Sequence, residues 1–184
     1  MPYTFTPYRL PGLILIEGKS FPDERGFFME SWRADDFTAA GIPPLVQDNL
    51  SRTHKGFVRG MHYQKYPSAV GKLIRCVRGA VWDAVIDIRK GSPTYGRHAS
   101  IELTDQGNRI LWVPIGFAHG FLALSEEADV QYKVTGYWVP ADDRGLLWND
   151  PAVGISWPGK DIRVADKDAK LPPLAQAENN FVWP

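Results

Sequence analysis

The amino-acid sequence has almost no cysteine, no long apolar run and no net charge. Cys76 is the single cysteine among 184 residues, so no intrachain disulfide can form, and its apolar neighbours make it a small core residue. The apolar run nearest the N-terminus, residues 13–16, is far too short to cross a membrane, and no signal peptide is visible before it. These absences predict a cytoplasmic protein with no membrane partner.

The balance of charge also restricts the partners. Lysine and arginine number 21, aspartate and glutamate also number 21, and the formal net charge is +0. Long-range attraction to nucleic acid is therefore not expected, although a local basic pocket is compatible with this balance. Hydrophobic residues make up 44% and charged residues 23%, which is typical of a globular protein. No linker or internal repeat divides the chain, so we expect a single domain over residues 1–184.

Apolar and polar residues alternate with a period of two along most of the chain, as in β-strands. Glycine and proline separate the alternating segments. One short helix is expected over residues 33–40, and the tail from about residue 149 is expected to pack on the outside. The expected strands cover residues 13–17, 26–32, 44–51, 57–64, 71–78, 80–88, 98–103, 109–113, 117–124 and 128–138. Many short strands with few short helices predict a mainly β protein, a jelly-roll double-sheet barrel.

The segment over residues 59–72 carries the most chemical information. His62 lies three residues after Arg59 and ten before Lys72. A neutral imidazole beside two fixed cations can take a proton next to a carbonyl while the cations stabilise the resulting negative charge. The residues alone leave open a structural histidine with two solvated basic neighbours. On a regular strand Arg59 and His62 point to opposite faces, so we predict a β-bulge at Gly60 that turns both toward one pocket.

Two further strands place polar groups on otherwise apolar faces. His119 shares a face with Phe117 and Phe121 in the strand over residues 117–124. Asp83 lies on a mostly apolar face of the strand over residues 80–88 and requires a partner, and a histidine such as His119 fits that need. In the strand over residues 128–138, Tyr132 shares an apolar face with its neighbours and with Trp138.

Other chemistries find little support in the sequence. The four histidines are isolated, so no metal is expected, although ligands from separate strands could still converge. No Gly-x-Ser-x-Gly nucleophile motif and no glycine-rich phosphate loop is present. Any phosphate must therefore be held by side chains such as Arg25, Arg59 and Lys72.

Several segments together resemble the dTDP-4-dehydrorhamnose 3,5-epimerase family of cupin-type jelly rolls. The resemblance covers roughly residues 13–172 and is specific because its motifs keep their order and spacing. The matching segments are residues 23–28, 47–49, 59–64, 71–73, 87–89, 114–121, 132–133 and 148–151. The resemblance implies a homodimer that acts on dTDP-4-keto-6-deoxy-glucose without a metal or any other cofactor.

The resemblance also implies roles for individual residues. His62 resembles the general base, Asp168 its orienting carboxylate, Tyr132 the acid on the opposite face of the sugar, and Lys72 the group that stabilises the enolate. Asp83 is expected to support His119. The positions that match residues holding the nucleotide sugar are Phe21, Arg25, Glu30, Gln47, Asp48, Asn49, Arg59, Lys72, His119, Trp138, Asp143 and Lys167. Phe21 and Arg25 are expected to reach the partner's site.

Three positions depart from the family pattern. Trp138 stands where a tyrosine that stacks on thymine is usual, Asp143 replaces a glutamate, and Val70 replaces a glutamine. These departures leave the catalytic set intact and bear on the choice of nucleotide and sugar. Alternative functions are a mono-epimerase acting at one carbon, a metal-dependent cupin isomerase or oxygenase that uses His62 and His119, and a sugar-binding cupin without catalysis.

Overall fold

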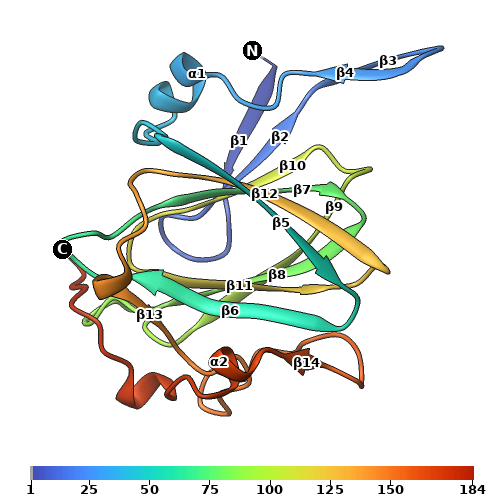
Figure 1. The fold of residues 1–184 in the computed structure, drawn as a ribbon. Helices are drawn as coiled ribbons and strands as arrows, with labels where there is room; N and C mark the ends of the chain where they lie inside the picture. Colours follow the sequence, from blue (N-terminus) through green and yellow to red (C-terminus); the bar gives the residue numbers. More distant parts are fainter. Residues whose placement is uncertain (1) are drawn as a thin grey trace.

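The computed structural model describes residues 2–184, which form two stacked β-sheets with a projecting hairpin (Figure 1). The upper sheet has the order β1 (Tyr3–Pro7), β2 (Ile14–Gly18), β10 (Arg109–Val113), β7 (Lys72–Arg78), β12 (Glu127–Val134) and β5 (Gln47–His54). The lower sheet has the order β13 (Asp143–Gly145), β6 (Phe57–Gln64), β11 (Phe117–Ala123), β8 (Ala80–Asp87) and β9 (His98–Thr104), and β14 (Arg163–Val164) pairs with β6. The hairpin consists of β3 (Ser20–Asp23) and β4 (Gly26–Met29).

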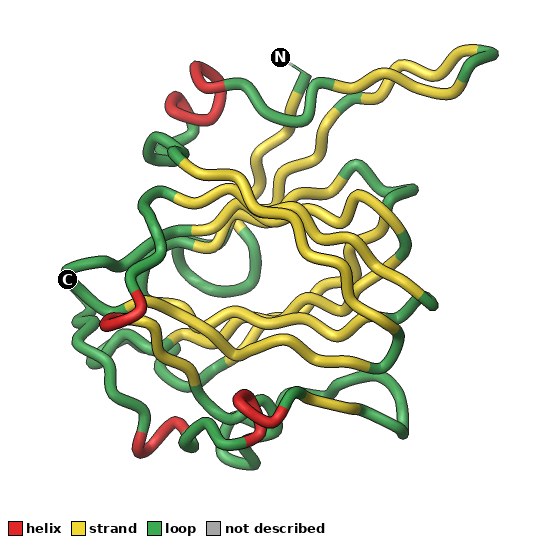
Figure 2. The backbone as a smooth tube through the Cα atoms, viewed as in Figure 1, coloured by secondary structure: helices red, strands yellow, loops and turns green. Residues whose placement is uncertain are grey.

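Helical segments are few and short, and strands dominate the backbone (Figure 2). They are α1 (Ala34–Ala39), α2 (Asp166–Ala169) and the 3₁₀ turns η1 (Pro140–Asp142) and η2 (Leu174–Gln176). The predicted mainly β, double-sheet jelly roll is confirmed. No helix within residues 2–184 has the length and apolar character needed to span a membrane.

The main apolar core lies between the two sheets, as the period-two alternation requires. Ile74 and Cys76 of β7 and Val130 of β12 point down into it, and Val85 of β8 and Phe121 of β11 point up. Toward β5 and β6 the inner faces carry polar residues such as Asn49, Arg59 and His62, which line a pocket. The space between the sheets is therefore part solid core and part pocket.

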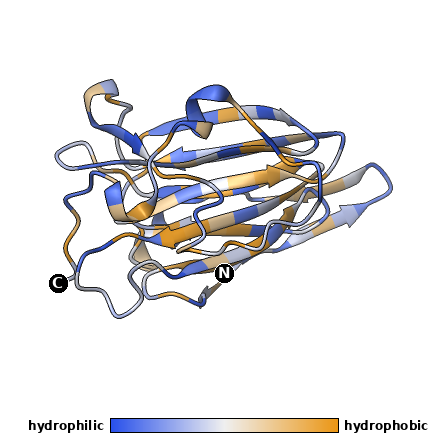
Figure 3. Cartoon of the chain, turned by 90° about the horizontal axis from the view of Figure 1, so that it is seen from below, coloured by the Kyte–Doolittle hydropathy of each residue, from blue (hydrophilic) through white to orange (hydrophobic). Residues whose placement is uncertain are grey.

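The C-terminal tail covers the outer face of the lower sheet. Leu174 and Phe181 of the tail pack with Ile86 and Ile88 of the β8 region in a second buried cluster. Seen from below, the tail crosses this face, where apolar positions gather on the strands beneath it (Figure 3). Because this packing anchors the tail, α2 is held against β6 beside the pocket.

Several predicted elements needed correction. The sequence interpretation missed β1, β3, β13 and β14. The strand expected over residues 26–32 ends at Met29, and the strand expected over residues 44–51 runs instead from Gln47 to His54. The strand expected over 128–138 ends at Val134, because the chain turns there, so Trp138 lies in the following loop. At Lys55 and Gly56 the chain turns from β5 of the upper sheet to β6 of the lower sheet, so these two consecutive strands do not pair.

The predicted bulge at Gly60 is confirmed. His62 pairs with His119 and Arg59 with Phe121, so three steps along β6 match two steps along β11. Gly60 has a φ of 123°, and a Cβ there would lie 2.7 Å from the Cα of Gly120. Only glycine fits this approach, and the extra residue turns Arg59 and His62 toward the same pocket.

Candidate active site

A cavity of about 760 Å³ opens between the upper and lower sheets. Its walls come from the inner faces of β5, β7 and β12 above and of β6 and β11 below, with α2 at its edge. The residues predicted for the site that line it are Gln47, Asn49, Arg59, His62, Lys72, His119, Tyr132, Trp138, Asp143, Lys167 and Asp168. The topology thus gathers residues from separate parts of the chain into one pocket.

His62 and Asp168 form a hydrogen-bonded pair on the lower wall. Asp168 lies on α2, 106 residues after His62 in the sequence. Its Oδ1 atom accepts a hydrogen bond of 2.8 Å from His62 Nε2. Its other oxygen, Oδ2, accepts the backbone N–H of Gly60 at 3.2 Å. Burial raises the pKa of the Asp168 carboxyl, but the bonds from His62 and Gly60 outweigh burial and hold that pKa below its usual value. The ionised carboxylate fixes the imidazole, and the His62 side chain is still 31% exposed toward the pocket.

His119 and Asp83 form a second pair, deeper in the molecule. His119 Nε2 lies 2.8 Å from Asp83 Oδ2, as the polar-on-apolar pattern predicted. The pair is nearly closed off, with side-chain exposures of 8% for His119 and 0% for Asp83. Asp83 Oδ1 is buried and has no hydrogen-bond partner within residues 2–184. The ring of His119 therefore reaches the pocket from a fixed, largely dry position.

Lys72 spans the space between the two sheets. It begins on β7 of the upper sheet, and its Nζ donates a hydrogen bond of 3.2 Å to the backbone carbonyl of His62 on the lower sheet. Burial lowers the pKa of Lys72 to about 8. The negative charges of Asp143 and Asp83 favour the ammonium and offset part of this shift. The ammonium is thus a poorly solvated cation close to the histidine, and it gains most from an anion placed in the pocket.

Tyr132 faces this cluster from the upper wall, where it pairs with Asn49 of β5 and Ile74 of β7. Burial raises the pKa of its phenol above the ordinary value, and the nearby guanidinium of Arg59 opposes that rise. The phenol therefore stays protonated at neutral pH and is available as a proton donor.

Arg59 is held by groups that the sequence interpretation missed. Its Nε donates to the buried Thr53 hydroxyl at 2.7 Å, and its Nη2 donates to the Arg52 carbonyl at 2.9 Å. Thr53 lies on the pocket face of β5, and the signal that could have found it is its period-two spacing from Asn49 and Gln47.

Other predicted binding residues divide into two groups. Gln47 and Asn49 share the pocket face of β5, and the Gln47 amide donates to Asn49 at 2.7 Å. Asp48 lies between them and points to the outer face, where Lys133 and Gln131 bind its carboxylate. Side chains alternate between the two faces of a strand, so Asp48 points away from the face of Gln47 and Asn49 and does not line the pocket of its own chain.

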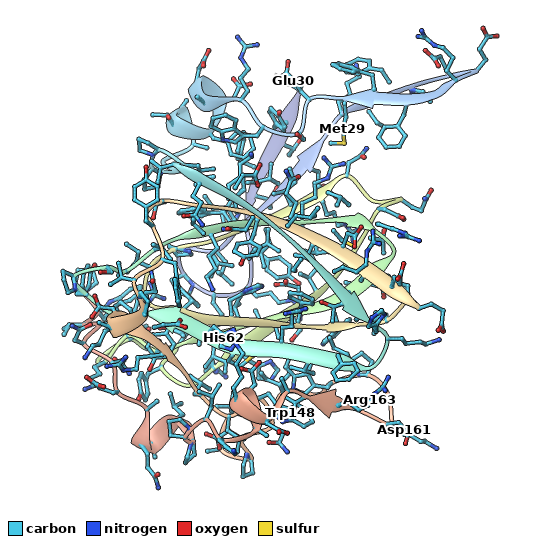
Figure 4. All side chains as sticks on the ribbon, in the orientation of Figure 1. Met29, Glu30, His62, Trp148, Asp161 and Arg163 are labelled. Carbon is cyan, nitrogen blue, oxygen red and sulfur yellow. The ribbon has the colours of Figure 1, made fainter. Side chains whose placement is uncertain are left out.

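Phe21, Arg25 and Glu30 also lie away from the pocket. Phe21 and Arg25 are on the projecting hairpin, and Arg25 binds Asp23 there. Glu30 lies at the base of the hairpin above the upper sheet, whereas His62 lies on β6 (Figure 4). These three side chains are out of reach of their own chain's pocket, and their binding roles stay predictions.

Metal ligation finds no support in the residues that the structure describes. Within residues 2–184 there is no group of three or more histidine, cysteine, aspartate or glutamate side chains placed to hold one ion. His62 and His119 each direct Nε2 to a carboxylate, which fixes the rings by hydrogen bonds. The donor set fits acid–base chemistry better than metal binding.

The model of the dTDP-4-dehydrorhamnose 3,5-epimerase family matches residues 7–176. The chain belongs to this family. A curated relative of that name from Shigella flexneri is 46% identical over 161 residues, which cover 86% of this chain and 89% of the relative.

Two further relatives bear on the type of reaction. The crystal structure of a 3,5-epimerase from Legionella pneumophila in complex with dTDP-4-keto-L-rhamnose is 40% identical, with a TM-score of 0.91 and coverage of 95% of this chain and 94% of that chain. A dTDP-4-dehydrorhamnose 3-epimerase from Streptomyces niveus is 36% identical over 97% of this chain and 87% of the relative. The family thus includes members named for one carbon and members named for two.

Proposed function

We propose that this epimerase-family protein inverts carbons 3 and 5 of dTDP-4-keto-6-deoxy-glucose and forms dTDP-4-keto-L-rhamnose. The observation that carries the proposal is the arrangement of the pocket. A histidine oriented by a carboxylate lies on the lower wall, a protonated tyrosine on the upper wall, and a desolvated lysine between them. Inversion requires a base and an acid on opposite faces of the sugar ring, and the two sheets supply them.

The chemistry follows from the 4-keto group. His62 takes the proton from carbon 5 or carbon 3, and the electrons of the broken C–H bond form an enolate with its charge on the oxygen of carbon 4. The Lys72 ammonium stabilises that oxygen, and Arg59 and His119 lie beside it. Tyr132 then delivers a proton to the opposite face of the same carbon, and solvent restores both protonation states. Each carbon ends with as many protons and electrons as it began.

The remaining pocket residues suit a nucleoside diphosphate. Arg59, Lys167 and the amides of Gln47 and Asn49 offer donors for the phosphates along β5 and α2. Trp138 presents a broad ring at the mouth, with 63% of the residue exposed, on which the thymine base can stack. The proposed steps use only side chains of the pocket and solvent, so the proposal includes no cofactor. A cytoplasmic location, where nucleotide sugars are used, stays a prediction.

We infer further that the protein is a homodimer in which each hairpin completes the partner's pocket. The hairpin of β3 and β4 projects from the upper sheet (Figure 1). It exposes the rings of Phe21, Phe27 and Phe28. At its base, Glu30 Oε1 is buried without a hydrogen-bond partner in the described residues. A second copy would cover these rings and bring Phe21, Arg25 and Glu30 toward a pocket that their own chain cannot reach.

Complementation tests this shared site. Arg25→Ala and His62→Asn variants, each inactive or weakened alone, should regain activity when mixed and re-assembled, because one pocket of each heterodimer then has both intact residues. Light scattering that gives a monomer mass, or mixing without recovery, would contradict the dimer proposal.

Incubation with dTDP-4-keto-6-deoxy-glucose in D₂O, read by NMR, tests the reaction. We expect deuterium at both carbon 3 and carbon 5, together with the L-rhamno product. Label at neither carbon would overturn the proposal. Label and inversion at carbon 3 alone would assign the protein to the mono-epimerases, the second candidate, which the similarity to the Streptomyces niveus 3-epimerase favours.

A further inference from the structure

Gln64 is a buried polar residue that the reaction does not use. It ends β6, two residues after His62, and only 6% of it is exposed. Its side-chain amide makes three hydrogen bonds, all to backbone atoms of other segments. Nε2 donates to the carbonyl of Ser68 at 2.8 Å and to that of Tyr137 at 3.1 Å, and Oε1 accepts the N–H of Val139 at 2.6 Å.

Two of these bonds bracket Trp138. The carbonyl of the residue before it and the N–H of the residue after it both bind the one amide of Gln64. Trp138 lies beyond the end of β12, and its ring and that of Tyr137 are mostly exposed, so neighbouring side chains hold this loop weakly. The Gln64 amide is therefore a main attachment of the Trp138 loop to the barrel.

We propose that Gln64 is a positioning residue that fixes Trp138 at the pocket mouth and thereby sets the affinity for the nucleotide. The inference rests on the proposed function, in which Trp138 stacks on the base. Gln64 shares β6 with His62, so the same strand positions the base of the reaction and the ring that binds the nucleotide.

The amide chemistry explains why glutamine suits this position. An amide has both donors and acceptors, which matches two carbonyls and one N–H, whereas a carboxylate or a thioether of similar length lacks the donors. Gln64→Met leaves the carbonyl of Tyr137 and the N–H of Val139 without their partner. The loop then samples several positions in the free protein, and nucleotide binding must order it. Ordering a side chain of this kind weakens binding by roughly threefold to tenfold.

A double-mutant cycle tests the proposal. Titration calorimetry with dTDP is performed on the wild type, Gln64→Met, Trp138→Ala and the double variant, together with NMR measurement of kcat and KM. We expect the Kd for dTDP to rise about threefold to tenfold in Gln64→Met, with KM rising in parallel and kcat nearly unchanged. In the Trp138→Ala background, Gln64→Met should have no further effect, because its influence passes through the indole ring.

A matched control removes similar bonds elsewhere. The Ser125 hydroxyl binds the N–H of Ala80 and the carbonyl of Glu127 at the other end of β12. Ser125→Ala should leave the Kd for dTDP unchanged. If Gln64→Met does not fold, Gln64→Glu keeps the acceptor for Val139 but loses both donors, and the same rise in Kd is expected.

The outcomes separate the two proposals. Wild-type protein that fails to bind dTDP overturns the proposed function and this inference with it. Wild-type protein that binds dTDP while the Gln64 variants bind equally well overturns the inference alone. The inference is also overturned if the losses of dTDP affinity in Gln64→Met and Trp138→Ala add fully in the double variant. It is overturned as well if kcat falls while Kd does not change, because Gln64 would then act on the fold as a whole.

Discussion

The two histidine–aspartate pairs of the pocket share a bond length of 2.8 Å but differ in how they are built. Asp83 and His119 come from adjacent strands, β8 and β11, and are almost fully enclosed. Asp168 comes from the tail and reaches His62 across 106 residues, and the His62 ring keeps 31% of its side-chain surface exposed. A base must meet its substrate and exchange protons with solvent, and we therefore propose that His62 transfers the proton while His119 has a fixed electrostatic role.

Replacing each histidine in turn gives the largest expected contrast between the pairs. His62→Asn removes the base and should lower kcat/KM roughly 10²–10⁴-fold, the usual range for general acid–base catalysis. His119→Asn removes the buried ring of the second pair, which does not take the proton in this proposal, and should cost less. Steady-state kinetics with dTDP-4-keto-6-deoxy-glucose measures both, and equal losses would contradict the division of roles.

Replacing Tyr132 separates the two faces of the sugar. Tyr132→Phe keeps His62 and its carboxylate, so the base can still take a proton and return it to the same face. We expect inversion to fall by roughly 10²-fold or more, while deuterium exchange with retained configuration continues. NMR of the recovered substrate in D₂O distinguishes the two processes. If Tyr132→Phe loses deuterium exchange as much as it loses inversion, Tyr132 has a role beyond that of the acid.

The two carboxylates should differ in what their removal affects. Asp168→Asn weakens the orientation of His62, and the loss of a hydrogen bond to a charged group predicts roughly a 10–100-fold fall in kcat. Asp83→Asn is expected to affect stability more than turnover, with the free energy of unfolding lower by about 1–3 kcal/mol. Kinetics and urea denaturation of both variants check this. The reverse pattern would exchange the roles of the pairs.

The pH dependence should reflect Lys72. Burial lowers its pKa to about 8, so the stabilising ammonium predominates below that pH and is lost as pH rises through it. The kcat/KM of the free enzyme should therefore fall about tenfold per pH unit above about 8. The Tyr132 phenol, with its pKa raised, is protonated throughout this range. Lys72→Arg should move this fall in kcat/KM to higher pH. A fall at the same pH in that variant would show that another group causes it.

The sequence predicted some parts of this pocket because their signals are local. Period two placed His119 and Asp83 on inner faces, and the glycine between Arg59 and His62 indicated the bulge that brings them together. The link from His62 to Asp168 came only from the family resemblance, because no local pattern predicts which strand the tail meets.

Other features depended on tertiary packing. Gln64 and Thr53 were missed because their partners are backbone and guanidinium groups from other segments. Trp138 was placed on a strand that in fact ends at Val134. The hairpin residues show the same limit, since their predicted binding role depends on a second chain.

The most direct test of the account follows the proton itself in the two histidine variants. Wild type, His62→Asn and His119→Asn are incubated with dTDP-4-keto-6-deoxy-glucose in D₂O, and NMR records the initial rate of deuterium entry at carbon 3 and carbon 5. We predict that His62→Asn loses exchange at both carbons by at least roughly 10²-fold, whereas His119→Asn retains measurable exchange. Continued exchange in His62→Asn, with exchange abolished in His119→Asn, would contradict the assignment of the more exposed pair as the base.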